Sequence, residues 1–432
     1  MKEIEINTTH LQRITVIDAL RGFALLGVIL MHMIDRFGYE ITNLTNNSSP
    51  STLDTYVHWF SNLVIRGKFI SIFSFLFGLS FFIQMERASK KGIDFRSRFL
   101  WRMLLLCIIG LIGTSFTYLD ILSIYALFGV ILVFLFPLKN WMLMLIVSLL
   151  LIGVPGVLLI GVENIKTESA TVHSSVSEQP ETVFMPETLP NNEPALSNLN
   201  YFQTAKENLT VKTINKLKFQ FLHSETGYLV LALFILGFVV GRLRFFEQVH
   251  IRKKRNLILF FAFTLATLVL ILTARMIEPD HSVNLLKLRS EGADVPFIAL
   301  VVSSLQNLST ITMSGALAMG FITLYQLEGI RKYLNWFTPY GRMGLTNYEM
   351  QNVIGAFLFS AWGLGSYFDG KGPAFLFVLG LLIYIIQIVI SRYWMKHFLY
   401  GPLEWCWRSG TYLKWQLFRK KANYKKVEMV LK

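Results

Sequence analysis

Apolar segments long enough to cross a lipid bilayer recur along almost the whole chain, and short polar segments separate them. A helix needs about 20 mostly apolar residues to span the hydrocarbon core. By length and hydropathy, the sequence predicts ten such helices. They are expected near residues 15–35, 68–85, 99–118, 120–138, 141–162, 227–245, 257–275, 297–325, 342–362 and 374–396. The predicted fold class is therefore an all-α polytopic membrane protein with about ten transmembrane helices.

Lysine and arginine gather in alternate connections between these segments. The basic connections follow the second, sixth and eighth segments, and a basic tail follows the tenth. With ten spans, all four lie on one side, and the excess of positive charge on cytoplasmic loops makes that side cytoplasmic. We therefore expect a multi-pass protein of the cell (plasma) membrane, with both termini cytoplasmic and the lipid bilayer as its surroundings.

Composition agrees with this class. Of 432 residues, 53% are hydrophobic and 16% are charged, against about 25% charged residues in soluble domains. The net charge of +14 lies in the loops and tail, so nucleic acid is not an expected partner. Two cysteines, Cys107 and Cys406, support neither a disulfide framework nor a cysteine-based metal site. No metal-ligand spacing appears elsewhere.

One connection is much longer than the others. Residues 163–219 are rich in Ser, Glu, Pro and Asn in their middle part, a composition typical of disorder. The predicted organisation is a five-helix half (1–162), a disordered extracytoplasmic insertion (163–219), a second five-helix half (220–400) and a basic cytoplasmic tail (401–432). The halves show no sequence repeat, so an inverted-repeat transporter is not supported on that ground.

The first apolar segment carries charges at both ends. Asp18 and Arg21 lie near its start and His32 near its end. A charge inside a spanning helix costs roughly 2.5 to 3.5 kcal/mol, so these residues need partners or a task. Arg21 and His32 are eleven positions apart, which is about 16 Å along a helix. The alternatives are a structural ion pair between Asp18 and Arg21, and an interfacial histidine near the outer surface.

Further polar residues stand at the ends of other segments. Arg66 and Lys68 precede the second, and Asp120 lies between the third and fourth. Asp120 is expected either to cap the fourth helix or to face Arg66, Lys68 or His32 at the outer mouth.

The C-terminal half adds a second polar group. The ninth segment begins with Arg342, followed by Asn347 and Gln351 on one helix face, and the tail carries Glu404 and Arg408. Interhelical hydrogen bonding and a substrate site are both open for the two amides.

Five stretches resemble a known family: IDALRGFALLGVIL at 17–30, KFISIFSFLFG at 68–78, LDILSIYALFG at 119–129, GRMGLTNYEMQ at 341–351 and YGPLEWCWRSGTY at 400–412. The family is domain of unknown function 418, the YeiB-like bacterial membrane proteins, which has no settled biochemistry. The opening stretch alone also resembles the first helix of the transmembrane acyltransferases, namely the acyltransferase-3 proteins and the heparan glucosaminide acetyltransferases. Arg21 and His32 match the R-x10-H spacing of acyltransferase-3 proteins.

The second resemblance implies transfer of an acyl group from cytosolic acyl-CoA, as donor substrate, to a sugar or envelope acceptor outside. His32 would be the base, with Asp35 or Asp120 orienting it. The donor phosphates would bind cations among the polar residues already named. The expected binding residues are Asp18, Arg21, Arg66, Lys68, Arg342, Asn347, Gln351, Glu404 and Arg408. The alternative is a transporter of a small, anionic solute lined by the same charges. The sequence leaves open a homodimer.

Overall fold

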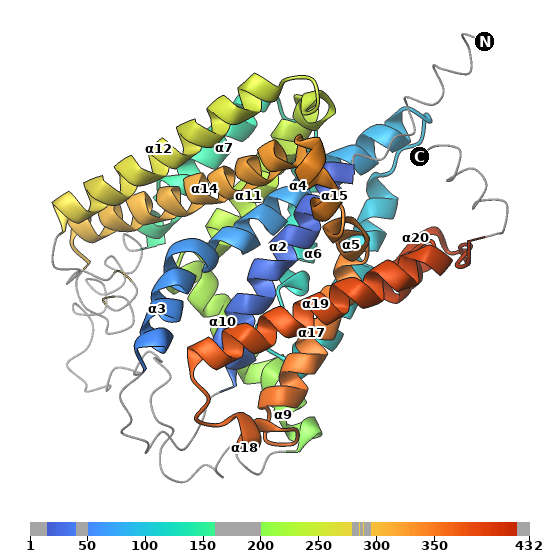
Figure 1. Ribbon diagram of the computed structural model, residues 1–432. Helices are drawn as coiled ribbons and strands as arrows, with labels where there is room; N and C mark the ends of the chain where they lie inside the picture. Colours follow the sequence, from blue (N-terminus) through green and yellow to red (C-terminus); the bar gives the residue numbers. More distant parts are fainter. Residues whose placement is uncertain are drawn as a thin grey trace, which may run out of the picture.

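The computed structural model describes residues 15–39, 51–159, 200–278, 285, 288 and 295–420, and this part of the chain is built from helices without strands. Figure 1 shows the longer helices packed side by side in one bundle. The longer helices are α2 (Thr15–Ile34), α4 (Lys68–Ser89), α5 (Arg96–Phe116), α11 (Thr226–Arg242), α12 (Lys253–Ile277), α14 (Phe297–Tyr325), α17 (Gly344–Phe359) and α19 (Pro373–His397). The shorter ones are η1 (Arg36–Gly38), α3 (Thr52–Phe60), η2 (Ser61–Ile65), α6 (Leu122–Leu135), α7 (Asn140–Leu151), α9 (Tyr201–Glu207), η4 (Asn208–Lys212), α10 (Thr213–Lys218), η5 (Phe219–His223), η6 (Phe245–Gln248), α15 (Glu328–Leu334), α16 (Phe337–Arg342), α18 (Gly365–Phe368) and α20 (Pro402–Tyr412).

Each of the ten predicted segments coincides with a helix, which confirms the all-helical class. Within the described residues, six helices are long and apolar enough to cross a membrane, and a seventh crossing arises if the bent pair 201–223 and 226–242 is one span. Helices α6 and α7 are apolar but shorter. The count of ten crossings therefore stays a prediction.

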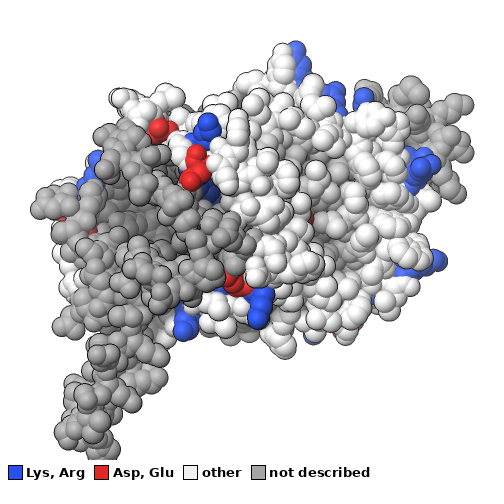
Figure 2. All heavy atoms as spheres, turned by 90° about the horizontal axis from the view of Figure 1, so that it is seen from below, with Lys and Arg blue, Asp and Glu red and all other residues white. Residues whose placement is uncertain are grey.

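Helix α2 occupies the centre of the bundle (Figure 1), where it packs against α4, α14, α16, α17 and α19. In its apolar window 78% of the residues are buried, against 6% for α12. Leu20, Leu25 and Ile29 of α2 are fully buried. Figure 2 shows a face made largely of uncharged side chains with small groups of charges. Such a surface suits a protein surrounded by lipid.

The basic connections meet at one end of the bundle. An ion pair joins the end of α4 to the connection after α11. A hydrogen bond joins that connection to the end of α14, and another joins the end of α14 to the start of α2. The pairs are Glu86 with Arg244 (2.8 Å), Val249 with Gln326 (2.8 Å) and Thr15 with Tyr325 (3.2 Å). We call this the Arg21 end and the opposite one the His32 end. The membrane side that the Arg21 end faces stays a prediction.

The predicted disorder of 163–219 is wrong for its last part. Residues 201–223 form a helical segment, α9 to η5, which starts with a capping box between Asn200 and Gln203. Asn208 is buried and donates to two carbonyl groups at the end of α5 (3.3 Å each). These contacts give polar residues buried partners, which composition alone does not reveal. Residues 163–199 lie outside the described part.

Candidate functional site

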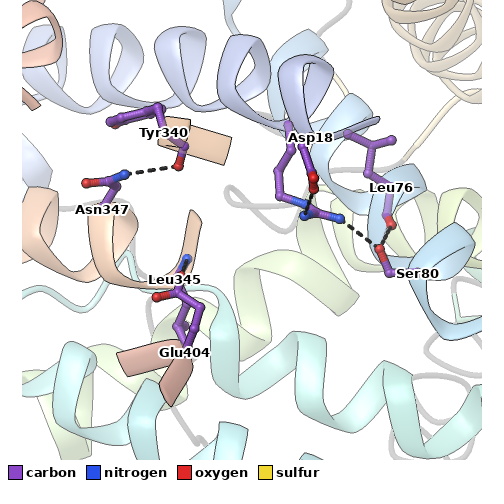
Figure 3. A network of polar contacts seen from close by, with 8 residues as sticks. Asp18, Leu76, Ser80, Tyr340, Leu345, Asn347 and Glu404 are labelled. Carbon is purple, nitrogen blue, oxygen red and sulfur yellow. Dashed lines mark hydrogen bonds and ion pairs between the residues drawn. The ribbon is translucent and has the colours of Figure 1, made fainter. Parts of the chain in front are cut away.

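Asp18 and Arg21 form an ion pair on one face of α2. The Arg21 Nη1 atom lies 3.2 Å from the Asp18 Oδ1 atom, and Nη2 donates to the Ser80 hydroxyl of α4 (3.0 Å). That hydroxyl donates to the carbonyl group of Leu76 (2.7 Å), so it is free to accept from Arg21 (Figure 3). Asp18 is 4% exposed. The ion-pair interpretation of Asp18 and Arg21 is confirmed, and Ser80 is an added partner.

Two glycines bring α16 directly against this turn of α2. A Cβ atom on Gly341 would lie 1.8 Å from the Asp18 carbonyl oxygen, and one on Gly22 would lie 2.4 Å from the carbonyl oxygen of Phe337. Close backbone approach of this kind is possible only without side chains at the contact. Arg21 and the start of α17 are neighbours for the same reason, because a Cβ on Gly344 would lie 3.2 Å from the Arg21 Cδ atom.

Glu404 caps α17 from the neighbouring helix α20. Its carboxylate accepts the backbone N–H groups of Leu345 (2.7 Å) and Thr346 (3.1 Å) and the Thr346 hydroxyl (2.6 Å). These N–H groups belong to the first turn, where helices lack internal partners. Burial raises the pKa of the Glu404 carboxyl, and the hydrogen bonds from Thr346 and Leu345 oppose that shift. Glu404, which the sequence predicts as a binding residue, is thus a helix cap (Figure 3).

Two further predicted cations lie at the same end. Arg342 donates to a backbone carbonyl group just after α19 (3.5 Å). The Arg408 guanidinium lies 5.1 Å from the ring centre of Tyr400 and 5.4 Å from that of Tyr412. With Arg21, these residues put three guanidinium groups at the Arg21 end, as the sequence predicts.

Asn347 and Gln351 hold three helices together. The Asn347 amide donates to the Tyr340 carbonyl oxygen (3.0 Å, Figure 3) and to the Ser391 hydroxyl (2.9 Å). The Gln351 amide donates to the Tyr340 hydroxyl (2.7 Å), which donates to Gln387 (2.9 Å). Buried networks of this kind link α16, α17 and α19. The interhelical interpretation of both amides is confirmed.

At the other end of α2, His32 is buried and does not face lipid. It is 5% exposed, and its ring stacks on Phe37 with a centroid separation of 5.2 Å. Its Nδ1 atom is buried and has no hydrogen-bond partner among the described residues. Asp35 forms an ion pair with Arg66 (2.5 Å), and Arg66 also donates to Asn62 (3.0 Å). Asp35 is therefore held by Arg66, near His32.

A cavity of about 820 Å³ lies beside Arg66 and Lys68, which both line it. Its other walls come from the end of α12 and the N-terminal half of α14. The structure therefore places the two cations that were predicted to bind substrate at the edge of a cavity. Arg21 and Arg342 do not line it.

Asp120 is fully buried, so it does not lie at an open outer mouth. Its Oδ1 atom accepts the backbone N–H of Leu122 (3.0 Å), and Oδ2 accepts the Asn352 amide (2.9 Å). Lys216 of α10 donates to its carbonyl group (2.7 Å). Asp120 therefore binds the first N–H group of α6 from the position before the N-cap residue, which is Ile121. The expectation that Asp120 faces His32, Arg66 or Lys68 is wrong, because α10 covers it and α17 binds it.

Sequence reasoning missed the residues that surround Asp120. Glu349 is 7% exposed, and its Oε2 atom accepts the Asn352 amide (3.4 Å). A Cβ on Gly113 would lie 2.4 Å from that oxygen. The signal was present, because a glutamate inside a predicted span carries the same insertion cost as Asp18. Asn352 lies one helical turn after Glu349, and it was missed because Glu349 was not recognised.

Metal chemistry has no ready-made site in the part of the chain that the structure describes. No three His, Cys, Asp or Glu residues there lie close enough to hold one ion. Cys107 and Cys406 are both free. The use of acyl-CoA as donor, without a metal, remains an expectation.

Comparisons with known proteins identify the relatives of this chain. A family model described as protein of unknown function (DUF418) matches residues 240–414. The chain is 28% identical to the uncharacterized protein YxaH of Bacillus subtilis (strain 168), over 95% of this chain and 97% of that protein. It is 25% identical to the uncharacterized protein YeiB of Escherichia coli (strain K12), over 93% of this chain and 97% of YeiB. These matches support a relationship of the chain to the DUF418 family.

A second family model matches the N-terminal part of the chain. It is described as heparan-alpha-glucosaminide N-acetyltransferase, catalytic, and it covers residues 13–193. The matched region contains all of α2, with Asp18, Arg21 and His32. The acyltransferase-like relationship therefore rests on more of the chain than the opening stretch.

Proposed function

We propose that this protein is a cell-membrane acyltransferase that moves an acyl group from cytosolic acyl-CoA to an acceptor outside the cytoplasm. The match of residues 13–193 to an acetyltransferase catalytic model carries the proposal. Those residues include one central helix with Arg21 near its start and a buried histidine in its last turn.

The donor would bind at the Arg21 end. Acyl-CoA carries several phosphate groups, and guanidinium groups recognise phosphate by paired hydrogen bonds. Arg21, Arg342 and Arg408 supply such groups there. The basic connections gather at that end as well, and the positive-inside rule assigns it to the cytoplasm.

The acceptor would react at His32. Imidazole is a suitable general base near neutral pH. His32 takes the proton of an acceptor hydroxyl or amine while the oxygen or nitrogen attacks the thioester carbon. The carbon–sulfur bond then breaks, and the coenzyme A thiolate takes up the proton from His32 as it leaves, so that the imidazole is neutral again. Stacking on Phe37 holds the ring in place.

Between its two ends, α2 carries buried apolar side chains. Leu25, Val28 and Ile29 are at most 3% exposed. A thioester bound at the Arg21 end therefore reaches His32 only when neighbouring helices move away from α2. The proposal thus includes a conformational change around α2 during transfer.

The test compares two histidine variants of the purified protein. With labelled acyl-CoA and native membrane lipids, His32→Ala should lower acyl transfer or hydrolysis about 10²–10⁴-fold, the usual contribution of a general base. His58→Ala is the control, because His58 is exposed on α3. Full activity in His32→Ala, or no acyl-CoA turnover in the wild type, contradicts the proposal. Solute flux in proteoliposomes without any acyl donor would favour a transporter instead.

A further inference from the structure

The cavity at the His32 end is built around a tight turn, Arg66-Gly67-Lys68, between η2 and α4. Gly67 has a φ of 79°, in the left-handed region that favours glycine. A Cβ there would lie 3.2 Å from the Thr310 side chain of α14. The turn is therefore pressed against α14, and Arg66 and Lys68 flank the glycine at the cavity.

Contacts within the turn hold both cations in position. Arg66 bonds to Asn62 (3.0 Å) and Asp35 (2.5 Å). The Lys68 ammonium donates to the Asn62 carbonyl oxygen (2.7 Å). These hydrogen bonds fix the positions of the Arg66 and Lys68 side chains. The two cations are therefore preorganised for a ligand, unlike mobile charges on a surface.

The cavity has an excess of positive charge. Among the described residues, three cations line it, Arg66, Lys68 and Arg275, against one carboxylate, Glu278. Even with Asp35 counted against Arg66, one positive charge remains. The N-terminus of α4 adds the positive end of a helix dipole. This electrostatics favours an anion.

The other lining residues are of two kinds, the uncharged polar side chains of Asn62, Gln306 and Ser309 and a set of apolar side chains. Leu63, Ile271 and Val302 line the cavity together with Trp59. Only 6% of the apolar window of α12 is buried, so the helix that carries Ile271 borders lipid. A ligand that fits both parts has a charged head and a hydrocarbon tail.

We propose that this cavity binds the acyl acceptor, and that the acceptor is an anionic phospholipid. Its phosphate would lie over Arg66 and Lys68, and its chain along Leu63 and Ile271. That the bound lipid is the acyl acceptor rests on the proposed function. Its link to the cavity is the ion pair of Arg66 with Asp35, which follows the helix turn that carries His32. The binding of a phospholipid is independent of that function.

The test measures lipid binding without any acyl donor. Fluorescent short-chain phosphatidylglycerol and phosphatidylcholine with the same tails are titrated against the full-length protein in a neutral detergent. We expect the anionic lipid to bind about tenfold more tightly, the effect of one hydrogen-bonded charge contact. Glycerol 3-phosphate, which has the head without the tail, should compete only at much higher concentration.

Matched variants locate the binding. Lys68→Gln with Arg275→Gln should abolish the preference for phosphatidylglycerol, and Lys68→Arg with Arg275→Lys should retain it. Arg331→Gln with Lys332→Gln is the control, because both residues lie on α15 beyond the far end of α14.

Three results would overturn the assignment: equal affinity for the two lipids, an unchanged preference in the glutamine pair, or displacement by glycerol 3-phosphate at lipid-like concentrations. Failure of the proposed function looks different. In that case selective lipid binding persists while the wild type transfers no acyl group. Acyl transfer with no lipid selectivity means that only the cavity assignment fails.

Discussion

Replacing Gly341 with alanine puts a methyl group where two backbones already touch. The new Cβ would lie 1.8 Å from the Asp18 carbonyl oxygen and 2.7 Å from the Gly22 nitrogen, although real Cβ contacts shorter than 3.0 Å essentially do not occur. Both are backbone atoms of α2, so no side-chain rotation relieves the contact. Helix α16 must move away from α2 by roughly 1 Å or more.

The cost follows from what that movement breaks. Overpacking a well-packed interior costs about 1–3 kcal/mol, and a clash between two backbones belongs at the upper end. The movement also disturbs the contact between the rings of Tyr340 on α16 and Tyr384 on α19, whose centroids lie 4.8 Å apart. We expect Gly341→Ala to destabilise the protein by about 3 kcal/mol and to weaken acyl-CoA binding at Arg21.

Thermal unfolding in detergent, followed by tryptophan fluorescence, measures the effect. The matched control is Gly329→Ala on α15, where an added Cβ meets nothing within 4 Å. That variant should unfold with the wild type. If Gly341→Ala also unfolds at the same temperature as the wild type, helices α2 and α16 do not meet at these glycines and the account of the Arg21 end is wrong.

Three other substitutions probe separate contacts. Glu404→Ala removes the cap of α17 and should cost about 0.5–2 kcal/mol in unfolding free energy, whereas Glu247→Ala, at an exposed position, should cost almost nothing; equal melting temperatures would refute the cap. Asn352→Leu removes the amide between Asp120 and Glu349 and should cost about 1–3 kcal/mol, and the lipid-facing Val353→Ala serves as its control. Arg21→Lys cannot reach both Asp18 and Ser80, so the KM for acyl-CoA should rise with little change in stability; an unchanged KM would remove Arg21 from the donor site.

The sequence was sufficient to predict where the helices lie and which of their connections gather at the same end of the bundle. Apolar runs of the right length predicted every long helix, because the bilayer demands such runs whatever the tertiary packing. The basic connections meet at one end, as their alternation predicts. The apolar runs did not reveal how far each helix extends. Helix α17 ends at Phe359. Helix α6 ends at Leu135, two residues before Pro137, which disfavours continuation of a helix.

Pairing between distant segments was not predictable from one sequence. Glu404 reads as an acidic residue in a basic tail, and only the fold brings it to the first turn of α17. Asp120 reads as a loop residue at a membrane surface, yet the helix at 201–223 covers it. That helix follows a polar insertion whose composition masked it. The sequence could have pointed to Glu349, because a carboxylate in an apolar span always needs an explanation.

The central claim is that one helix serves a donor on one side of the membrane and an acceptor on the other. Inside-out membrane vesicles that contain the protein test it when labelled acetyl-CoA or palmitoyl-CoA is added to the outer, cytoplasmic-face solution. The account predicts that label enters lipid or sugar material at the enclosed face with the wild type and with His58→Ala, and not with His32→Ala. Equal labelling with His32→Ala, or label confined to the outer face, would contradict it.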